Sequence, residues 1–509
     1  MTISRATLFW GIGICSLLAI VLQIGVLHLG FAAASADESA RALIAQGLDW
    51  GNAFKPYIWP PFYQVAVGLW LKVHPDLFYG PREMAVFFGL LSLWAVAALA
   101  LELFGDRLVA LVSAILAVFL HHRLLLSVAP MSEIFFNCFV LWGAYGVARY
   151  TGRGQSGALV FGALMFMLSG TVRFEGWFVS LAFIAFVLWQ QTAAGRADRA
   201  VAFLAVGIAL AFPLLWVGLS FYHYGDLSGI TVARDQNISV GTSWTEILRN
   251  SHLLRFLSDA SQSALILGLI ASLGAFWYLP STRAVIAVAV LGMGLASLAA
   301  VATASNPLAA PWRIAGAWVS QLIPFSAMAL VWLARKAGVM LRLPVLAGGV
   351  MLSVASLAWN GWQLVERRLA SPFHFDADIL ALRNAIGNDV NPATARVLID
   401  SEKVFFLDVV VALNRPDATE YTTGNDPVSI ALYIGAKDYW QAEETPEGRA
   451  IYAKYIAPKF DPAAGASLLA DRGIRYVILQ DKELRAQTAD MEGVTFRGAY
   501  GPWHLFERM

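Results

Sequence analysis

Two adjacent carboxylates, Asp37 and Glu38, follow the first apolar run of the chain, residues 10–30. A carboxylate placed where a membrane helix meets water can act as a general base toward a substrate hydroxyl. Residues 37–48 also show helical spacing of apolar side chains, which predicts an amphipathic helix on the outer membrane surface. Because a carboxylate is favoured at a helix start, two interpretations stay open. Either Asp37 caps the helix and Glu38 is solvated, or one of them is a catalytic base.

Four more charged groups stand beside apolar stretches. Arg173 and Glu175 lie in the turn GTVRFEGW, Glu133 opens the stretch after APMS, and Arg313 precedes another stretch. Charged groups at membrane depth usually face a cavity or a partner, and a guanidinium fork suits a phosphate. The alternatives are structural. Arg173 and Glu175 could pair with each other, Glu133 could complement its helix dipole, and Arg313 could be an interfacial positive charge.

Aromatic residues crowd the segment YIWPPFYQ, where Trp59 and Tyr63 flank Pro60-Pro61. The prolines break the chain, and a second amphipathic helix is predicted to begin after them. The aromatic side chains either anchor this helix at the membrane interface or form a wall for a sugar or a lipid headgroup.

The composition indicates a membrane protein. Of the 509 residues 58% are hydrophobic and 14% are charged, whereas a soluble protein carries about 25% charged residues. The net charge of +1 does not suggest a nucleic-acid partner. The two cysteines, Cys15 and Cys138, lie in apolar runs and are interpreted as small core residues. The spacing of cysteine and histidine predicts no metal site.

Eleven apolar stretches approach the roughly 20 residues that a membrane-spanning helix needs. The predicted spans are 7–30, 84–104, 107–128, 131–149, 156–172, 174–190, 200–222, 262–279, 284–303, 315–334 and 343–363. The first is longer than the apolar region of a signal peptide, so we interpret it as an uncleaved anchor. The third is interrupted by His121, His122 and Arg123 and is expected to be short.

The distribution of basic residues predicts the orientation. Arginine and lysine concentrate in the short loops on the side of the N-terminus, which is therefore placed in the cytoplasm. Eleven spans then put the C-terminus outside. Residues 31–83, residues 223–261 and the tail from about 364 also fall on the outer side.

The tail differs from the rest of the chain. ARVLIDSEKVFFLDVVVAL predicts a strand followed by a helix, and GIRYVILQD and WHLFER predict two more strands. The expected fold class is a polytopic α-helical membrane domain, residues 1–363, with a C-terminal extracytoplasmic α/β domain, residues 364–509.

Five short motifs follow one another along the chain: Asp37-Glu38, Pro60-Pro61-Phe62-Tyr63, Ser132-Glu133, Arg173-Phe174-Glu175 and Tyr224-Gly225-Asp226. Their order and predicted topology resemble the GT-C superfamily of glycosyltransferases, especially bacterial members similar to protein O-mannosyltransferases and aminoarabinose transferases (family 39). The resemblance covers roughly residues 1–335. The family pattern usually has aromatics soon after the acidic pair, where this chain has Ser39-Ala40-Arg41.

The resemblance implies a glycosyltransferase of the bacterial inner membrane. A hexose such as mannose, or a pentose, would pass from a polyprenyl phosphate to a protein, lipid or polysaccharide acceptor on the extracytoplasmic side, with inversion. Asp37 would be the general base, and Glu38 would support it or orient the sugar. The donor would be held by Arg173, Arg313, Glu175, Glu133, Tyr63 and Trp59. No cofactor would be required, although some members use a divalent cation and that use stays open here.

Two other functions stay open. A transporter or flippase of lipid-linked sugars would need polar residues inside its spans, and AVFFGLLSLWAVAALALELFG has almost none before Glu102. A non-enzymatic membrane scaffold with an outer binding domain would tolerate replacement of the outer acids.

Overall fold

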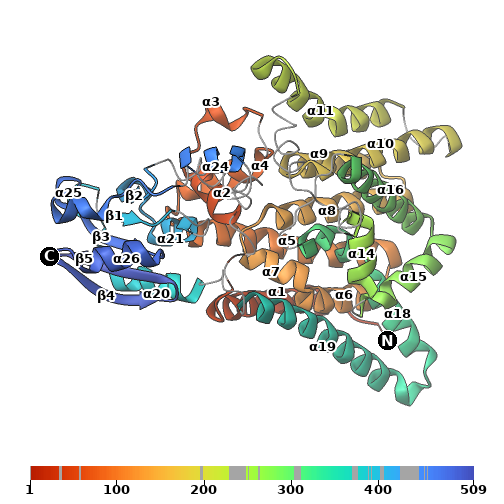
Figure 1. The fold of residues 1–509 in the computed structure, drawn as a ribbon. Helices are drawn as coiled ribbons and strands as arrows, with labels where there is room; N and C mark the ends of the chain where they lie inside the picture. The colour runs from red at the N-terminus through yellow and green to blue at the C-terminus, as the bar shows by residue number, and fades with distance from the viewer. Residues whose placement is uncertain are drawn as a thin grey trace.

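The computed structural model describes residues 2–31, 33, 37–56, 59–194, 199–227, 248–249, 251–261, 264–302, 311–369, 376–387, 389–390, 392–401, 406–424, 446–451, 453–454 and 457–509. A large helical region and a smaller region built around a sheet lie side by side (Figure 1). The C-terminus lies in the sheet region, and the N-terminus lies at the far end of the helical region.

Helices of 5 to 28 residues build the helical region. They are α1 (Arg5–His28), α5 (Tyr79–Phe104), α6 (Arg107–Phe119), α7 (His121–Val128), α8 (Ser132–Arg153), α9 (Ser156–Val172), α10 (Glu175–Ala194), α11 (Arg199–Tyr224), α14 (His252–Ser261), α15 (Leu265–Tyr278), α16 (Pro280–Ala302), α17 (Gly316–Ser320), α18 (Ile323–Lys336) and α19 (Arg342–Leu369). Shorter helices α2 (Asp37–Gln46), α3 (Trp50–Ala53) and α4 (Phe62–Leu71) lie between α1 and α5, and the 3-10 helix η1 (Pro311–Ala315) precedes α17.

The chain is an integral membrane protein with several spans. Six described helices are long and apolar enough to cross a membrane, and the number rises to eight if each of two bent helix pairs is one span. Helices lie at all eleven predicted ranges, but some, such as the 17-residue α9, are short. The count of eleven spans and the orientation of the termini stay predictions.

The interruption expected near His121 is a sharp bend. α6 and α7 meet at 53° around Leu120. Arg123 is 1% exposed, and its guanidinium turns back to donate hydrogen bonds to the carbonyls of Ala117 at 2.7 Å and Val118 at 3.2 Å. The last carbonyls of a helix lack partners within it, so this side chain satisfies the end of α6 inside an apolar region.

α8 crosses the helical region and packs closely against α9. A Cβ on Gly146 would lie 2.8 Å from the Cα of Gly162. Small residues allow such an approach between membrane helices.

The C-terminal region contains a five-stranded sheet of order β2-β1-β3-β5-β4. Its strands are β1 (Arg396–Ile399), β2 (Thr419–Tyr421), β3 (Ile474–Leu479), β4 (Val494–Tyr500) and β5 (Trp503–Arg508). β1 is parallel to β2 and β3, whereas β5 is antiparallel to β3 and β4. The helices of this region are α20 (Asp376–Ile386), α21 (Phe406–Leu413), α24 (Pro446–Ile451), α25 (Gly465–Asp471) and α26 (Lys482–Ala489).

The central strand β3 is buried on both faces. Tyr476 and Ile478 join the apolar cluster that continues into the helical region, and Val477 and Leu479 join a separate cluster on the other face. Strands appear where they were predicted at β1, β3 and β5. The three-residue β2 and the half-exposed edge strand β4 were not predicted.

The sheet region contacts the segment between α1 and α5. α21 packs against α2, where the Ser39 hydroxyl donates to the Asp408 carboxylate. Arg383 of α20 pairs with Asp76 at 2.8 Å. Since α19 continues to Leu369, the helix runs past the predicted boundary at 363, and the division into two domains stays a prediction.

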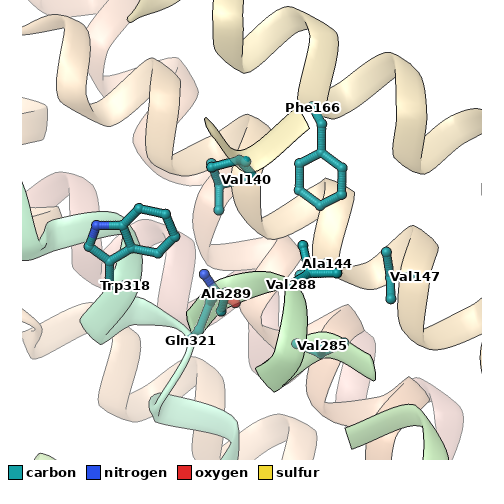
Figure 2. Close-up of a pocket in the computed structure, with 10 residues that line it drawn as sticks. Val140, Ala144, Val147, Phe166, Val285, Val288, Ala289, Trp318 and Gln321 are labelled. Atoms are coloured by element: carbon teal, nitrogen blue, oxygen red, sulfur yellow. The ribbon is translucent and has the colours of Figure 1, made fainter. Parts of the chain in front are cut away.

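One internal cavity lies between α8, α9, α10, α16 and α17 (Figure 2). It is lined by apolar side chains such as Val140, Phe166 and Trp318, with Gln321 the one polar side chain lining it. Its volume is about 10 Å³, which is the space of about one water. It is a packing gap and not a substrate site.

Candidate functional site

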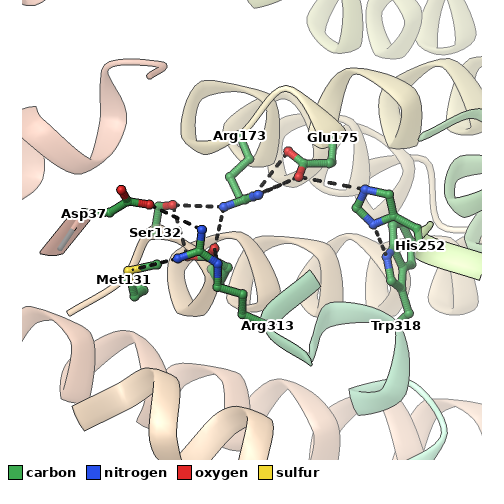
Figure 3. Close-up of polar contacts among 9 residues, drawn as sticks. Asp37, Met131, Ser132, Arg173, Glu175, His252, Arg313 and Trp318 are labelled. Carbon is green, nitrogen blue, oxygen red and sulfur yellow. Dashed lines mark hydrogen bonds and ion pairs between the residues drawn. The ribbon is translucent and has the colours of Figure 1, made fainter. Parts of the chain in front are cut away.

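Five elements converge on one charged cluster (Figure 3). Asp37 begins α2, Glu133 lies in the first turn of α8, Arg173 directly follows α9, Glu175 begins α10, and Arg313 lies in η1. The residues lie in four motifs that are far apart in the sequence, and the structure brings their side chains together.

Arg173 holds two carboxylates at once. Its Nη1 donates to Glu133 Oε1 at 2.7 Å, and its Nη2 donates to Glu175 Oε1 at 2.6 Å. Nε lies 3.2 Å from both oxygens of Glu175. The pairing of Arg173 with Glu175, one of the two alternatives, is therefore present. Charge-assisted contacts of this kind are short and directional, so the turn between α9 and α10 is tied to α8.

Arg313 connects the same centre to α2. Its Nη2 lies 3.3 Å from Asp37 Oδ2, and its Nε lies 3.5 Å from Glu133 Oε1. Its Nη1 lies 4.0 Å from the sulfur of Met131, which is a weak acceptor. Glu133 thus stands between two guanidinium groups, and its position explains why a carboxylate is tolerated with only 4% exposure.

Exposure separates Asp37 from the other acids. The Asp37 side chain is 41% exposed, against 4% for Glu133 and 20% for Glu175. Asp37 therefore lies on the water-accessible border of the cluster.

The interpretation of Glu38 as a solvated residue is wrong, since it is 2% exposed. α2 also buries Ser39 and Arg41, so it is not a helix whose polar face lies open on the membrane surface. The physical reason is its surroundings, because α4 and α21 both pack against it. The helix was predicted correctly from the spacing of its apolar residues, but nothing in the sequence indicated that α21 would pack against it.

Arg41 is a site residue that was not predicted. It is 4% exposed, its guanidinium carbon lies 4.3 Å from the centre of the Trp59 ring, and its Nε and Nη1 have no hydrogen-bond partner among the described residues. Burial lowers the pKa of Arg41, against the opposing effect of Asp37. The sequence held one signal, an arginine where the resemblance predicts aromatics.

Trp59 and Tyr63 differ in position. Trp59 is partly buried and stacks on Arg41. Tyr63 is fully buried, and its hydroxyl donates to the Pro130 carbonyl at 2.6 Å. Burial raises the pKa of Tyr63. Tyr63 therefore supports the chain just before α8 and does not line an open wall in this structure.

A second layer of polar contacts extends from Glu175. His252 Nε2 lies 4.0 Å from Glu175 Oε1, and the Trp318 indole N–H lies 3.4 Å from His252 Nδ1. No feature of the sequence pointed to His252, which follows a long segment. Most of that segment, residues 228–247, lies outside the described residues.

The cluster does not offer a metal site. No group of three or more histidine, cysteine, aspartate or glutamate side chains with suitable geometry is found among the residues that the structure describes. Glu133 and Glu175 face arginines, whose positive charge would repel a cation. Glu133 and Glu175 therefore do not fit a divalent ion.

Solved structures share this fold, although no family model and no curated protein matches the sequence. ArnT from Cupriavidus metallidurans in the apo state has a TM-score of 0.61 and 12% identity, over 99% of each chain. ArnT bound to undecaprenyl phosphate has a TM-score of 0.62 and 13% identity, again over 99% of each chain. The apo oligosaccharyltransferase of Archaeoglobus fulgidus has a TM-score of 0.52 and 12% identity, over 96% of this chain and 72% of that one. The GT-C-like fold expected from the motif order is confirmed.

Proposed function

We propose that the chain transfers a sugar from a polyprenyl-phosphate donor to an acceptor hydroxyl at the α2 end of the helical region. The observation that carries this proposal is the half-exposed carboxylate of Asp37, 3.3 Å from a buried guanidinium. In such a pair the carboxylate can accept a proton from the acceptor hydroxyl, and the guanidinium can bind the departing phosphate. The fold shared with ArnT, a protein crystallised with undecaprenyl phosphate, supports a polyprenyl-linked donor.

The reaction balances without a cofactor. Asp37 accepts the proton of the acceptor hydroxyl while the hydroxyl oxygen bonds to the anomeric carbon. The bond from that carbon to the phosphate oxygen breaks, and its electron pair leaves on the polyprenyl phosphate. Attack opposite to the phosphate inverts the anomeric carbon. Glu38, next in the chain and buried, supports the position of Asp37.

Arg313 and Arg41 bind the phosphate in this proposal. A phosphate oxygen is a stronger acceptor than the Met131 sulfur that Arg313 Nη1 faces at 4.0 Å. It would also supply a partner for Arg41, whose burial disfavours its charge. Arg173 is engaged by Glu133 and Glu175, so we assign it a positioning role in place of the direct phosphate contact that the motif resemblance implies.

The sugar is a hexose or a pentose, and the acceptor approaches from the extracytoplasmic side, where we place the C-terminal region. The contact of α21 with α2 puts that region beside the proposed base. We therefore expect it to help bind or orient the acceptor.

The test uses the full-length protein in nanodiscs with polyprenyl-phosphate mannose and polyprenyl-phosphate aminoarabinose as probes, and measures release of polyprenyl phosphate. General bases contribute roughly 10²–10⁴-fold, so Asp37→Asn should lose at least about 100-fold in rate with unchanged thermal stability. Asp49→Asn, which replaces another exposed acid of the first outer segment, should keep full activity.

The two alternatives give different results. A flippase would move the donor across the bilayer without releasing polyprenyl phosphate, and a scaffold would do neither. Donor consumption at the wild-type rate in Asp37→Asn would show that Asp37 is not the base.

A further inference from the structure

A second cavity lies at the other end of the helical region, between α1, α5 and α8. Its volume is about 510 Å³, within the range of ligand sites. α8 begins in the site cluster at Ser132 and ends at Arg153, which lines this cavity. At 1.5 Å per residue its 22 residues separate the two places by about 33 Å. The N-terminus in Figure 1 marks this end, away from the sheet.

Arginines gather at the ends of the helices that form this cavity. Arg5 of α1, Arg107 of α6 and Arg153 of α8 all line it. Arg107 Nη1 donates to the Ile3 carbonyl at 3.2 Å, and Arg153 Nε donates to Glu102 at 2.6 Å. A guanidinium has five N–H donors, so these contacts leave most of the donor capacity for a ligand.

The acids at this end are already paired. Glu102 lies within ion-pair distance of two arginines of α8, and Asp106 pairs with Arg335 of α18. Within the described part of the chain, no ion pair to Arg5 or Arg107 is found. These two arginines therefore form an excess of positive charge at the cavity.

The deeper wall of the cavity is apolar. Trp94 and Leu101 of α5 and Trp142 of α8 line it. The Trp94 indole N–H donates to the Ser16 hydroxyl of α1 at 3.2 Å, which fixes the ring between the two helices. Positive charge at the helix ends and an apolar wall toward the membrane centre match the two halves of an anionic lipid.

We propose that this cavity binds one anionic phospholipid from the leaflet at the amino end of α1. Its phosphate lies beside Arg5 and Arg107, and an acyl chain lies against Trp94 and Trp142. The site is separate from the proposed transfer reaction, since no residue of the Asp37 cluster lines it. The simpler explanation, that the arginines only set the membrane orientation, predicts no bound lipid.

The experiment measures lipid retention by native mass spectrometry of the full-length protein. The protein is titrated with phosphatidylglycerol or, separately, with phosphatidylcholine of the same acyl chains. We expect one phosphatidylglycerol to bind at least about 10-fold more tightly than phosphatidylcholine. The double variant Arg5→Gln/Arg107→Gln should lose this preference. The matched control Arg283→Gln/Lys336→Gln, which removes two exposed positive charges outside the cavity, should keep it.

A third variant separates lipid binding from orientation. Arg5→Lys/Arg107→Lys keeps the charges that set topology but loses the guanidinium forks, so it should weaken phosphatidylglycerol binding at least about threefold. Equal binding of the two lipids by the wild type would overturn the proposal, as would equal losses in the cavity and control variants. Displacement of the lipid by millimolar inorganic phosphate would also overturn it, because the site would then recognise a free anion.

Discussion

The two ends of the helical region both collect arginines, but they accommodate them differently. At the α2 end, Arg173 and Arg313 are largely buried and share Glu133. At the other end, Arg153 is half-exposed and pairs with Glu102. The buried guanidinium groups of this cluster are balanced by matched acids, whereas an exposed pair contributes little to stability. The comparison shows that the number of arginines alone does not distinguish a cluster of buried ion pairs from a set of exposed ones.

The largest expected effect tests this difference with two buried acids. Glu133→Gln leaves two buried guanidinium groups without their shared partner, so we expect a loss of about 3–5 kcal/mol in unfolding free energy. Glu102→Gln removes an acid of similar burial, which is 5% exposed. Because its arginine partners reach water, we expect a loss of about 1 kcal/mol or less in unfolding free energy. Thermal unfolding in one detergent measures both. Equal losses would remove the contrast between the two ends.

A smaller effect is expected from Arg41. Arg41→Gln should raise the donor KM at least about 10-fold, because a hydrogen-bonded charge contact to a phosphate contributes about 1.5–3 kcal/mol. Stability should not fall, since an arginine with orphaned donors is costly to bury. Steady-state kinetics with varied donor concentration measures the KM. Arg153→Gln is the control at the other end, and an unchanged KM in Arg41→Gln would place the phosphate elsewhere.

Removing the hydrogen bond between α2 and α21 should have a still smaller effect on stability. Ser39→Ala removes the donor to Asp408 and should cost about 1 kcal/mol of local stability. Hydrogen exchange of α21 should then become about fivefold faster, while exchange in β3 stays the same. Faster exchange throughout the sheet would indicate that the contact holds the whole region and not one helix.

The smallest effect concerns pH. Burial raises the pKa of Asp76, but the hydrogen bonds from Arg383 and from the backbone outweigh it, so the pKa is lowered overall. A lowered pKa stabilises the folded state above the unfolded value of about 3.9. That stability is lost as the pH falls through the folded pKa. The difference in thermal stability between wild type and Asp76→Asn should therefore persist at pH 6 and shrink below about pH 4. A constant difference would mean that the pair does not titrate.

Much of the helical framework could be predicted from the sequence, because apolar runs and breakers are local signals. The interruption near His121 and the strands β1, β3 and β5 are examples. The burial of α2 could not be predicted, since the helix that covers it, α21, begins more than 360 residues later. The role of His252 was missed for the same reason. When a cluster is assembled from distant elements, the sequence indicates its charged residues but not the contacts between them.

The contact between Ser39 and Asp408 joins residues 369 positions apart, and this separation has a consequence for synthesis. At about 5–20 residues per second, a ribosome needs roughly 20–70 s to make the intervening chain. A nascent protein already inserted in the bilayer therefore lacks the partner that packs on its acidic helix. We expect a chain truncated after Leu369 to insert normally but to leave the α21 side of its acidic helix uncovered.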